Sequence, residues 1–399
     1  MKRSYLTVLI CAATLLTVSV GIRQGLGLFL KPISLDLGVG REVFAFAMAL
    51  QNLLWGAAAP FAGGIADKYG TGRTLAVSAL FYAAGLYAMA ISTGSGELFL
   101  GSILLGLGLS GLGFSVALGA VGRAAPPEKR SMALGICAAG GSFGQFIMVP
   151  YGEYFLSSLG WSSALMVLAA TSLIMVPLSA GVAGQQASAA DQDKQSLMAA
   201  LKEAAGHRGF QLLTAGFFVC GFQVVFVAVH LPSYLADLGI ESWVAAWCLA
   251  LVGLFNIIGS YSAGVLGSKF RKKYVLAWIY LGRSLVFLVF ILMPLTSTSA
   301  LVFASALGLL WLSTIPLTSG LIAQVFGPTY MSMLYGVVFF SHQVGSFLGA
   351  WLGGYFFDVF GSYDAMWVIC IGLGFFAAAM HYPITDQPMT RLSAKGAAA

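Results

Sequence analysis

The sequence predicts an all-α membrane protein in which twelve transmembrane helices form two parallel six-helix repeats. Three observations lead to this prediction. Hydrophobic residues make up 59% of the 399 residues and charged residues only 9%, whereas a soluble domain carries about 25% charged residues. Apolar stretches long enough to cross a bilayer recur along the whole chain. Short motifs of the first half recur in the second half at one fixed offset.

Each apolar stretch of roughly 20 residues predicts one transmembrane helix. The first stretch follows Met1-Lys2-Arg3 directly and is expected to stay as an uncleaved span. The predicted spans are 6–30, 43–66, 73–93, 97–122, 131–156, 161–184, 209–236, 242–267, 274–295, 299–324, 331–357 and 363–384. The sequence thus divides into an N-terminal six-helix bundle (1–184), a polar cytoplasmic linker (185–208) and a C-terminal six-helix bundle (209–399). The second half of the linker is compatible with a short surface helix.

Positive charge is distributed unevenly across the predicted membrane. An even number of spans places both termini on one side, and 16 of the 20 lysines and arginines fall on that side. The opposite loops hold only Lys31 and Arg41, while Arg23 and Arg283 fall inside spans. Because cytoplasmic loops are enriched in Lys and Arg, we expect both termini to be cytoplasmic in a bacterial inner membrane. The net charge of +6 follows from this asymmetry and predicts no nucleic-acid partner.

An internal repeat relates the two halves of the chain. Asp36-Leu37-Gly38 recurs as Asp237-Leu238-Gly239, an offset of 201 residues. The same offset relates Gly63 and Lys68 to Gly264 and Lys269, Pro127, Ser131, Met132 and Gly135 to Pro328, Ser332, Met333 and Gly336, and Gly160 and Ala164 to Gly361 and Ala365. This offset carries six helices onto six, and an even number gives both halves the same orientation. Parallel repeats of this kind place a solvent cavity between two bundles near the bilayer midplane.

The loop after the second predicted span carries a further motif. Residues 63–73 read Gly-Gly-Ile-Ala-Asp-Lys-Tyr-Gly-Thr-Gly-Arg and resemble the signature Gly-x3-Asp-(Arg/Lys)-x-Gly-(Arg/Lys) of the major facilitator superfamily. The resemblance covers essentially the whole chain and implies a secondary transporter with the major facilitator fold. Asp67, Lys68 and Arg73 are the residues of a predicted charge latch, the cytoplasmic gate. The second copy has Ser268 in place of the Asp, so the latch is expected to be asymmetric.

A closer resemblance is to the monocarboxylate-transporter-like branch of this superfamily. It rests on Gly21-Ile22-Arg23-Gln24-Gly25, on His230-Leu231-Pro232 and on Ser341-His342-Gln343-Val344-Gly345. The resemblance implies transport of monocarboxylates. Animal members of the branch carry an Asp and an Arg four residues apart in the eighth span, where this chain has Asn256 and Ser260.

Two arginines lie deep in predicted spans without a carboxylate at comparable depth. Charges inside a membrane are costly and are by default functional candidates. Arg23 lies about 12 Å from the outer helix end and Arg283 about 15 Å from the inner one, at 1.5 Å per residue. An arginine fork matches a carboxylate with two parallel hydrogen bonds, which predicts a small organic anion as substrate. Two alternatives stay open: Arg23 extends to the outer interface, and Arg283 bonds backbone carbonyls.

Other polar residues in the spans complete the candidate substrate site. Histidine as a residue type can gain and lose a proton near neutral pH, so His342, near mid-depth, is the candidate for proton coupling; a structural histidine between helices is the alternative. His230, near the outer end of the seventh span, and Gln223, two turns earlier, are predicted at the cavity mouth. Buried amides need hydrogen-bond partners, and the sequence leaves open whether they face substrate or other helices. The remaining predicted binding residues are Gln24, Asn52, Gln145, Asn256 and Gln343.

Several other classes of protein do not fit the sequence. It contains no phosphate-binding loop of the Walker type and no His/Cys pattern of a zinc site, so we expect no enzyme activity, no cofactor and no metal. The five cysteines lie in apolar stretches and are expected to be buried. We therefore predict a monomeric transporter that moves a small organic anion, with a proton or a counter-anion as coupling ion. The alternative is a proton-coupled exporter of drugs or amphipathic compounds, although residues 140–145 lack the Gly-Pro pair typical of such antiporters.

Overall fold

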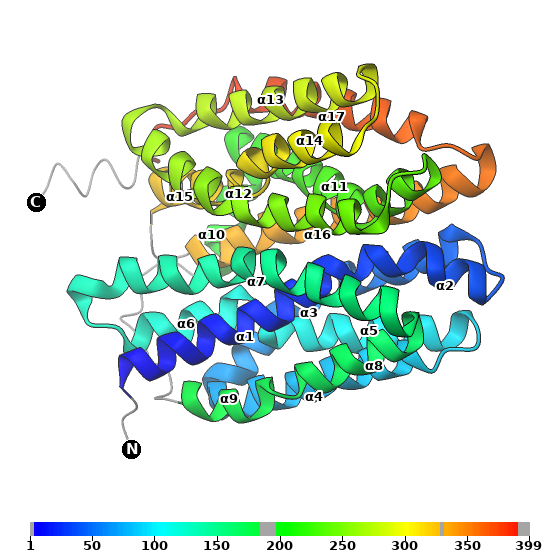
Figure 1. The fold of residues 1–399 in the computed structure, drawn as a ribbon. Helices are drawn as coiled ribbons and strands as arrows, with labels where there is room; N and C mark the ends of the chain where they lie inside the picture. Colours follow the sequence, from blue (N-terminus) through cyan, green and yellow to red (C-terminus); the bar gives the residue numbers. More distant parts are fainter. Residues whose placement is uncertain (1–3, 184–196, 328–330, 390–399) are drawn as a thin grey trace, which may run out of the picture.

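The computed structural model describes residues 4–183, 197–327 and 331–389, which form helices and no strands (Figure 1). The first half contains α1 (Tyr5–Gly25), η1 (Leu26–Phe29), α2 (Leu30–Asp36), α3 (Arg41–Tyr69), α4 (Thr71–Ala90), α5 (Ser95–Leu112), α6 (Phe114–Ala124), η2 (Pro127–Lys129), α7 (Arg130–Leu159), α8 (Trp161–Ser172) and α9 (Met175–Val182). The second half contains α10 (Leu197–Gly206), α11 (Arg208–Asp237), α12 (Ser242–Lys269), α13 (Lys272–Leu292), α14 (Ser297–Leu310), α15 (Thr314–Phe326), α16 (Met331–Phe360) and α17 (Asp364–His381).

The predicted spans correspond to these helices. Eleven helical segments in the described residues are long and apolar enough to cross a membrane. The remaining predicted span, 331–357, coincides with the 30-residue helix α16. The prediction of twelve membrane helices is confirmed. Part of the predicted linker lies outside the described residues, and its second half contains α10.

Three of the predicted spans are interrupted, which the sequence prediction did not include. The backbone is extended at Gly113, between α5 and α6. A turn at residues 173–174 separates α8 from α9. Residues 311–313 separate α14 from α15, just before Pro316. Proline has no N–H and its ring crowds the carbonyl four residues earlier, which disfavours a regular helix through this position.

The helices form two bundles that lie one above the other in Figure 1, with α1 to α9 in the lower bundle and α11 to α17 in the upper one. The repeat extends to backbone geometry. We call two residues related by the offset of 201 mates. Gly38 and its mate Gly239 have φ of 63° and 79°, and Gly160 and its mate Gly361 have φ of 80° and 68°. Glycine adopts this left-handed region without steric cost. The offset of 201 residues therefore repeats tight turns as well as sequence.

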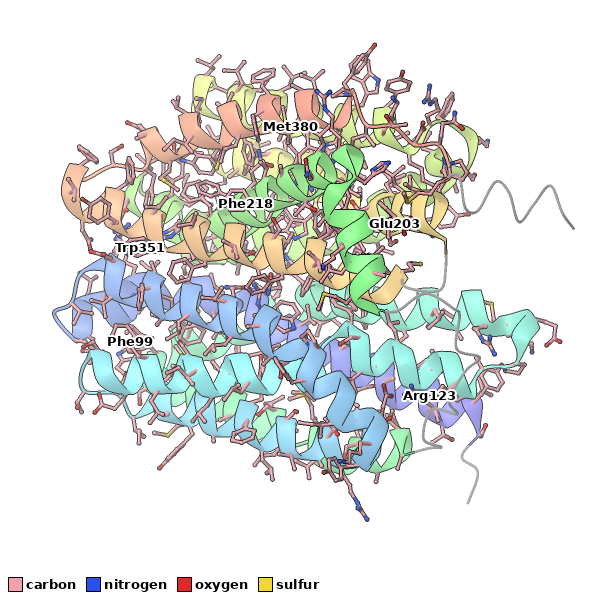
Figure 2. All side chains as sticks on the ribbon, turned by 180° about the vertical axis from the view of Figure 1, so that it is seen from behind. Phe99, Arg123, Glu203, Phe218, Trp351 and Met380 are labelled. Carbon is pink, nitrogen blue, oxygen red and sulfur yellow. The ribbon has the colours of Figure 1, made fainter. Side chains whose placement is uncertain are left out.

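Aromatic side chains join the bundles at their boundary. Figure 2 labels Phe99 on the lower bundle and Trp351 on the upper one. Phe46 of α3 lies between them, with ring centroids 5.6 Å from Phe99 and 6.2 Å from Trp351. Edge-to-face pairs of this kind stabilise packed interfaces. Contact between the bundles therefore extends from α5 through α3 to α16.

The two bundles touch on one side of the molecule and part on the other. We call the side where α1 begins and α17 ends the terminus side, and the other the opposite side. A Cβ added at Gly354 would lie 2.8 Å from the Arg41 carbonyl oxygen of the other bundle, and one at Gly56 would lie 2.7 Å from Gln343 Cβ. The opposite side and the middle are therefore closely packed.

The terminus-side halves of the same helix faces are not packed. Gly63 follows Gly56 by seven residues, and Gly336 precedes Gln343 by seven, so each lies on the same helix face as its partner. A Cβ at Gly63 or Gly336 would meet no atom within 4 Å. The mates of these two glycines, Gly264 and Gly135, are equally free. The structure is thus closed on the opposite side and open on the terminus side.

Candidate functional site

Arg23 lies at the boundary between the bundles, in the last turns of α1. Its Nη1 donates to Gln24 Oε1 at 2.7 Å, and its Nη2 donates to Asn52 Oδ1. The guanidinium also lies over the Trp55 ring, 4.9 Å from the centroid. Its Nε has no hydrogen-bond partner among the described residues, and no described carboxylate pairs with it. Arg23 is therefore a cation held only by neutral groups.

Five buried amides form a layer around Arg23, which we call the amide layer. It consists of Gln24, Asn52, Gln145, Asn256 and Gln343. Three of its hydrogen bonds cross between the bundles: Gln145 Nε2 to the Leu249 carbonyl at 2.8 Å, Gln343 Nε2 to the Asn52 carbonyl at 3.0 Å, and Asn256 Nδ2 to Ser142 Oγ at 2.8 Å. Gln24 donates to Gln145 within the lower bundle at 3.0 Å. The layer thus connects Arg23 to both bundles.

A small void borders Arg23 on the side of the second bundle. Its lining includes Arg23, Gln51 and Asn52 from the lower bundle and Val225 and Val229 from α11. It leaves about 10 Å³ for water centres, which is room for about one water molecule. This void is therefore too small for an organic anion in this conformation.

His342 lies beside the amide layer in α16. Its Nδ1 is 3.1 Å from Gln343 Oε1 and 3.4 Å from Ser346 Oγ. The ring stacks against Phe339 with centroids 5.8 Å apart and also packs against Phe217. Gln343 also bonds the Asn52 carbonyl across the boundary, so His342 contacts a residue that joins the two bundles.

Arg283 lies inside the second bundle, at the break between α14 and α15. Its Nε and Nη2 donate to the Leu310 carbonyl at 3.0 and 2.7 Å, and its Nη2 also donates to the Trp311 carbonyl. Its Nη1 contacts Gln223 Oε1 at 3.4 Å, and Gln223 donates to the Cys370 carbonyl. Within a membrane, carbonyls freed by a helix break must find donors in the protein, and Arg283 supplies them.

Asn256 contributes to the same break. Its Oδ1 accepts the backbone N–H of Leu312 at 2.9 Å, while its Nδ2 bonds Ser142 of the other bundle. Asn256 therefore stabilises the irregular backbone of the tenth span and joins it to the boundary between the bundles.

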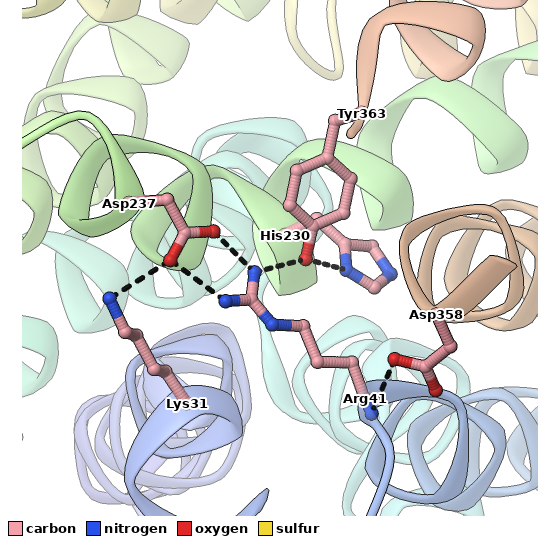
Figure 3. Close-up of polar contacts among 6 residues, drawn as sticks. All are labelled: Lys31, Arg41, His230, Asp237, Asp358 and Tyr363. Atoms are coloured by element: carbon pink, nitrogen blue, oxygen red, sulfur yellow. Dashed lines mark hydrogen bonds and ion pairs between the residues drawn. The ribbon is translucent and has the colours of Figure 1, made fainter. Parts of the chain in front are cut away.

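An ion cluster closes the opposite side (Figure 3). Asp237, at the end of α11, accepts Lys31 Nζ at 2.9 Å and both Nη atoms of Arg41 at 2.6 and 2.8 Å. Asp358 accepts the backbone N–H groups of Arg41 and Glu42 at the N-terminus of α3, at 3.0 and 2.8 Å. A carboxylate is favoured at a helix N-terminus by the free N–H groups and the helix dipole. We call Lys31, Arg41, Asp237 and Asp358 the opposite-side gate.

His230 is attached to this gate through Tyr363. Arg41 donates to Tyr363 Oη at 3.0 Å, Tyr363 Oη lies 3.3 Å from His230 Nδ1, and His230 Nε2 lies 2.7 Å from the Ala350 carbonyl. A carbonyl only accepts, so Nε2 carries the proton and Nδ1 accepts from the tyrosine. A tyrosine hydroxyl is protonated at neutral pH, as this chain of bonds requires. His230 is thus a neutral part of the closed interface.

The terminus side carries a different arrangement of the predicted cytoplasmic gate. Asp67 pairs with Arg123, with Oδ1 and Nη1 3.5 Å apart, and Arg123 also donates to Thr71 Oγ1 at 2.9 Å. Lys68 lies near the Tyr69 ring. No described bond of Asp67 or Arg73 crosses to the second bundle. In this open conformation the latch residue Asp67 is therefore held within its own bundle.

The structure brings the predicted site residues into three groups. Arg23, the amide layer and His342 lie together between the bundles. Arg283 and Gln223 lie inside the second bundle, and His230 lies in the opposite-side gate. Sequence reasoning missed Asp237, Arg41 and Lys31 as gate residues, although Lys31 and Arg41 stood out as the two cations of the opposite loops. The described residues contain no group of three or more His, Cys, Asp or Glu suited to a metal ion.

Comparison with known proteins establishes the family. The family model described as Major Facilitator Superfamily matches residues 9–349. The chain belongs to the Major Facilitator Superfamily. It is accordingly a multi-pass membrane protein and a secondary transporter, and the predicted resemblance to the monocarboxylate-transporter-like branch is confirmed by its relatives.

Two curated relatives cover most of the chain. An uncharacterized MFS-type transporter, YcxA of Bacillus subtilis (strain 168), is 24% identical over 369 residues, covering 88% of this chain and 87% of the relative. Monocarboxylate transporter 13 of Rattus norvegicus is 26% identical over 316 residues, covering 78% and 72%.

Solved structures share the fold at lower identity. A bacterial homolog of the human lysosomal transporter Spinster, in an inward-facing and unoccupied conformation, superimposes with a TM-score of 0.79 at 13% identity, covering 98% of this chain and 100% of that one. A D-xylose–proton symporter gives 0.74 at 14% identity, covering 96% and 99%. The predicted twelve-helix major facilitator fold is confirmed.

Proposed function

We propose that this protein transports a small organic anion, of the carboxylate class, across the bacterial inner membrane by alternating access. Proton symport or exchange for a counter-anion supplies the driving force. The observation that carries the proposal is Arg23, a cation between the two bundles that contacts neutral groups and has no carboxylate partner among the described residues. The relationship to monocarboxylate transporters of mammals supports the same substrate class.

The chemistry of Arg23 favours an anionic ligand. Arg23 is partly buried; withdrawing a cation from water without an opposite charge is costly, and an anion supplied by the substrate offsets that cost. Carboxylates bind arginine with two parallel, charge-assisted hydrogen bonds. Arg23 has five N–H donors, of which one on Nη1 is bonded to Gln24 and one on Nη2 to Asn52. A carboxylate that binds both Nη atoms approaches the guanidinium on the edge where these two amides lie. Substrate binding at Arg23 therefore competes with the bonds of the amide layer.

This competition links binding to conformational change. Asn52 joins Arg23 on one side and, through its carbonyl, Gln343 of the second bundle on the other. An anion that takes Arg23 from Asn52 alters the interface at the point where the bundles meet. The remaining amides, Gln24, Gln145 and Asn256, form the polar wall of the proposed binding site.

Three residues have supporting roles in the proposal. His342 carries or gates the coupling proton, because it contacts Gln343 at the boundary. Arg283 and Gln223 shape the second bundle at the break of the tenth span in this conformation, so their predicted contact with the anion stays a prediction.

The termini face the cytoplasm, which makes the terminus side the inner one.

The test is uptake into proteoliposomes. Purified protein is assayed with radiolabelled lactate, pyruvate, acetate and oxalate, with an inward proton gradient and separately with the same anion inside. We expect uptake of at least one acid by the wild type. Arg23→Gln should lower it by about tenfold or more, because a charge-assisted hydrogen bond contributes about 1.5–3 kcal/mol.

Two matched variants make the result specific. Arg23→Lys keeps the charge and should retain part of the transport, and Arg208→Gln, an exposed arginine at the start of α11, should leave it unchanged. Wild-type uptake of the active acids by Arg23→Gln would contradict the role of Arg23. Transport of a lipophilic cation such as tetraphenylphosphonium, with none of the acids, would favour the exporter alternative.

A further inference from the structure

Glu153 is a buried carboxyl group at the boundary between the bundles on the opposite side. It lies in α7, six residues before the end of the helix, and only 7% of it is exposed. The hydroxyl of Ser242, the first residue of α12 in the other bundle, faces the carboxyl. The Oε2 atom is buried and has no hydrogen-bond partner within the described part of the chain. Closure of this interface therefore removes the Glu153 carboxyl from water, and few hydrogen bonds replace those that it made to water.

The repeat shows that this acid is a feature of one interface only. The mate of Glu153 is Gly354, which lets α16 approach the Arg41 carbonyl of α3 closely. At that interface the negative charge comes from Asp358, which is fully engaged by two backbone N–H groups. Its mate, Ser157, carries no charge. The two interfaces related by the repeat therefore differ. In the described ranges, only the α7–α12 interface closes over an acid in which one carboxylate oxygen lacks a hydrogen-bond donor.

The charged groups nearest in the fold are occupied elsewhere. On the elements that pack at this end of the boundary, Lys31 binds Asp237, Asp36 accepts the Trp161 indole N–H, and Glu241 accepts the Trp243 indole N–H. None of the described ion pairs includes Glu153. Among the described residues, therefore, no cation pairs with Glu153 in the closed interface.

We propose that Glu153 is a proton-binding site that controls closure of the opposite side. With the opposite side open, the carboxylate faces water and is ionised. A proton taken from that water converts it to the neutral acid, and the α7–α12 interface then closes over it. Closing over an ionised, unpaired carboxylate is strongly unfavourable, so the closed state requires the proton. This site is separate from Arg23 and does not depend on which anion is carried.

The test follows the opposite side directly, without substrate. Spin labels are attached at Ile91→Cys and Leu292→Cys, exposed positions in different bundles on the opposite side, in a Cys11→Ser background because the other native cysteines are buried. Distances are measured by double electron–electron resonance in nanodiscs from pH 5 to 9. We expect the closed-to-open ratio to rise as the pH falls, by up to about tenfold per pH unit for one linked proton.

Three variants determine whether Glu153 is the group responsible. Glu153→Gln, which resembles the protonated acid, should be closed at every pH. Glu153→Asp should keep the pH dependence, and Glu97→Gln, a carboxyl at the start of α5 on the same side, should behave as the wild type. Thermal unfolding of each variant checks that it is folded.

The proposal is overturned by any of three results. These are a wild type without pH dependence, a Glu153→Gln variant that keeps the wild-type pH dependence, and a Glu153→Gln variant that opens at every pH, as expected if Glu153 were an ionised cap of α12. Because the assay uses no substrate, failure of the Arg23 proposal leaves this test unaffected, and the reverse also holds.

Discussion

Replacing Asp237 by Asn should open the opposite side. Asp237 is the one acceptor in the gate that binds two cations of the other bundle, Lys31 and Arg41. Asparagine keeps one oxygen acceptor but loses the charge, so Lys31 and Arg41 both lose their ionic partner. Arg41 retains its hydrogen bond to Tyr363 Oη and its position over the Phe357 ring. The variant tests whether these ion pairs hold the bundles together.

The structure sets the size of the effect. The side chains of Arg41, Asp237 and Lys31 are 11%, 25% and 32% exposed, so the pairs are neither fully solvated nor fully buried. Solvated pairs contribute about 0–1 kcal/mol and breaking a buried pair costs about 3–5 kcal/mol. We therefore expect a loss of about 1–2 kcal/mol, which lowers the closed-to-open ratio by about 5–30-fold.

The repeat supplies the matched control. Asp36 is the mate of Asp237, but its carboxylate accepts the Trp161 indole N–H within its own bundle at 2.9 Å. Asp36→Asn should therefore leave the distances between labels at Ile91→Cys and Leu292→Cys unchanged, while Asp237→Asn shifts them to longer values. A distribution for Asp237→Asn that superimposes on the wild type, or an equal shift for Asp36→Asn, would refute the reasoning.

Two further variants act on the same closure. Tyr363→Phe removes the hydroxyl that accepts from Arg41 of the other bundle and contacts His230 Nδ1. It should lower the closed-to-open ratio by about 5–150-fold, because leaving a buried polar group unpaired costs about 1–3 kcal/mol; a wild-type distance distribution would contradict this. Gly27→Ala places a Cβ 2.1 Å from the Ala228 carbonyl oxygen of the other bundle and should open the opposite side, whereas Gly63→Ala meets no atom and should not. Equal behaviour of the two glycine variants in the spin-label assay would show that this close approach is unimportant.

The fold could be predicted from the sequence because the bilayer leaves few choices. Backbone groups in lipid must bond within their own segment, so each long apolar stretch is a helix. Hydropathy alone therefore gave twelve spans, and the offset of 201 residues gave two parallel halves. The interruptions were less visible, because Pro316 and Gly113 lie in stretches that remain apolar throughout.

The site could be predicted only in part. Arg23, Gln24 and Asn52 were predicted and lie together, because α1 and α3 line the boundary between the bundles. Arg283 was predicted by depth alone, and depth does not reveal that the nearest acceptors are the carbonyls of a broken helix.

The sequence by itself determined the class of the protein, its membrane helices, its repeat and the asymmetry of its charges. The tertiary structure decided the partners of each polar side chain. Asp36 and Asp237 stand in the same three-residue motif, yet one bonds within its bundle and the other across the boundary. Glu153 and Gly354 are mates, and only docking of the two bundles buries one of them as an unpaired acid. Local patterns determine helices because those bonds are local, whereas a gate joins residues up to about 300 positions apart in a geometry that depends on which side of the transporter is closed.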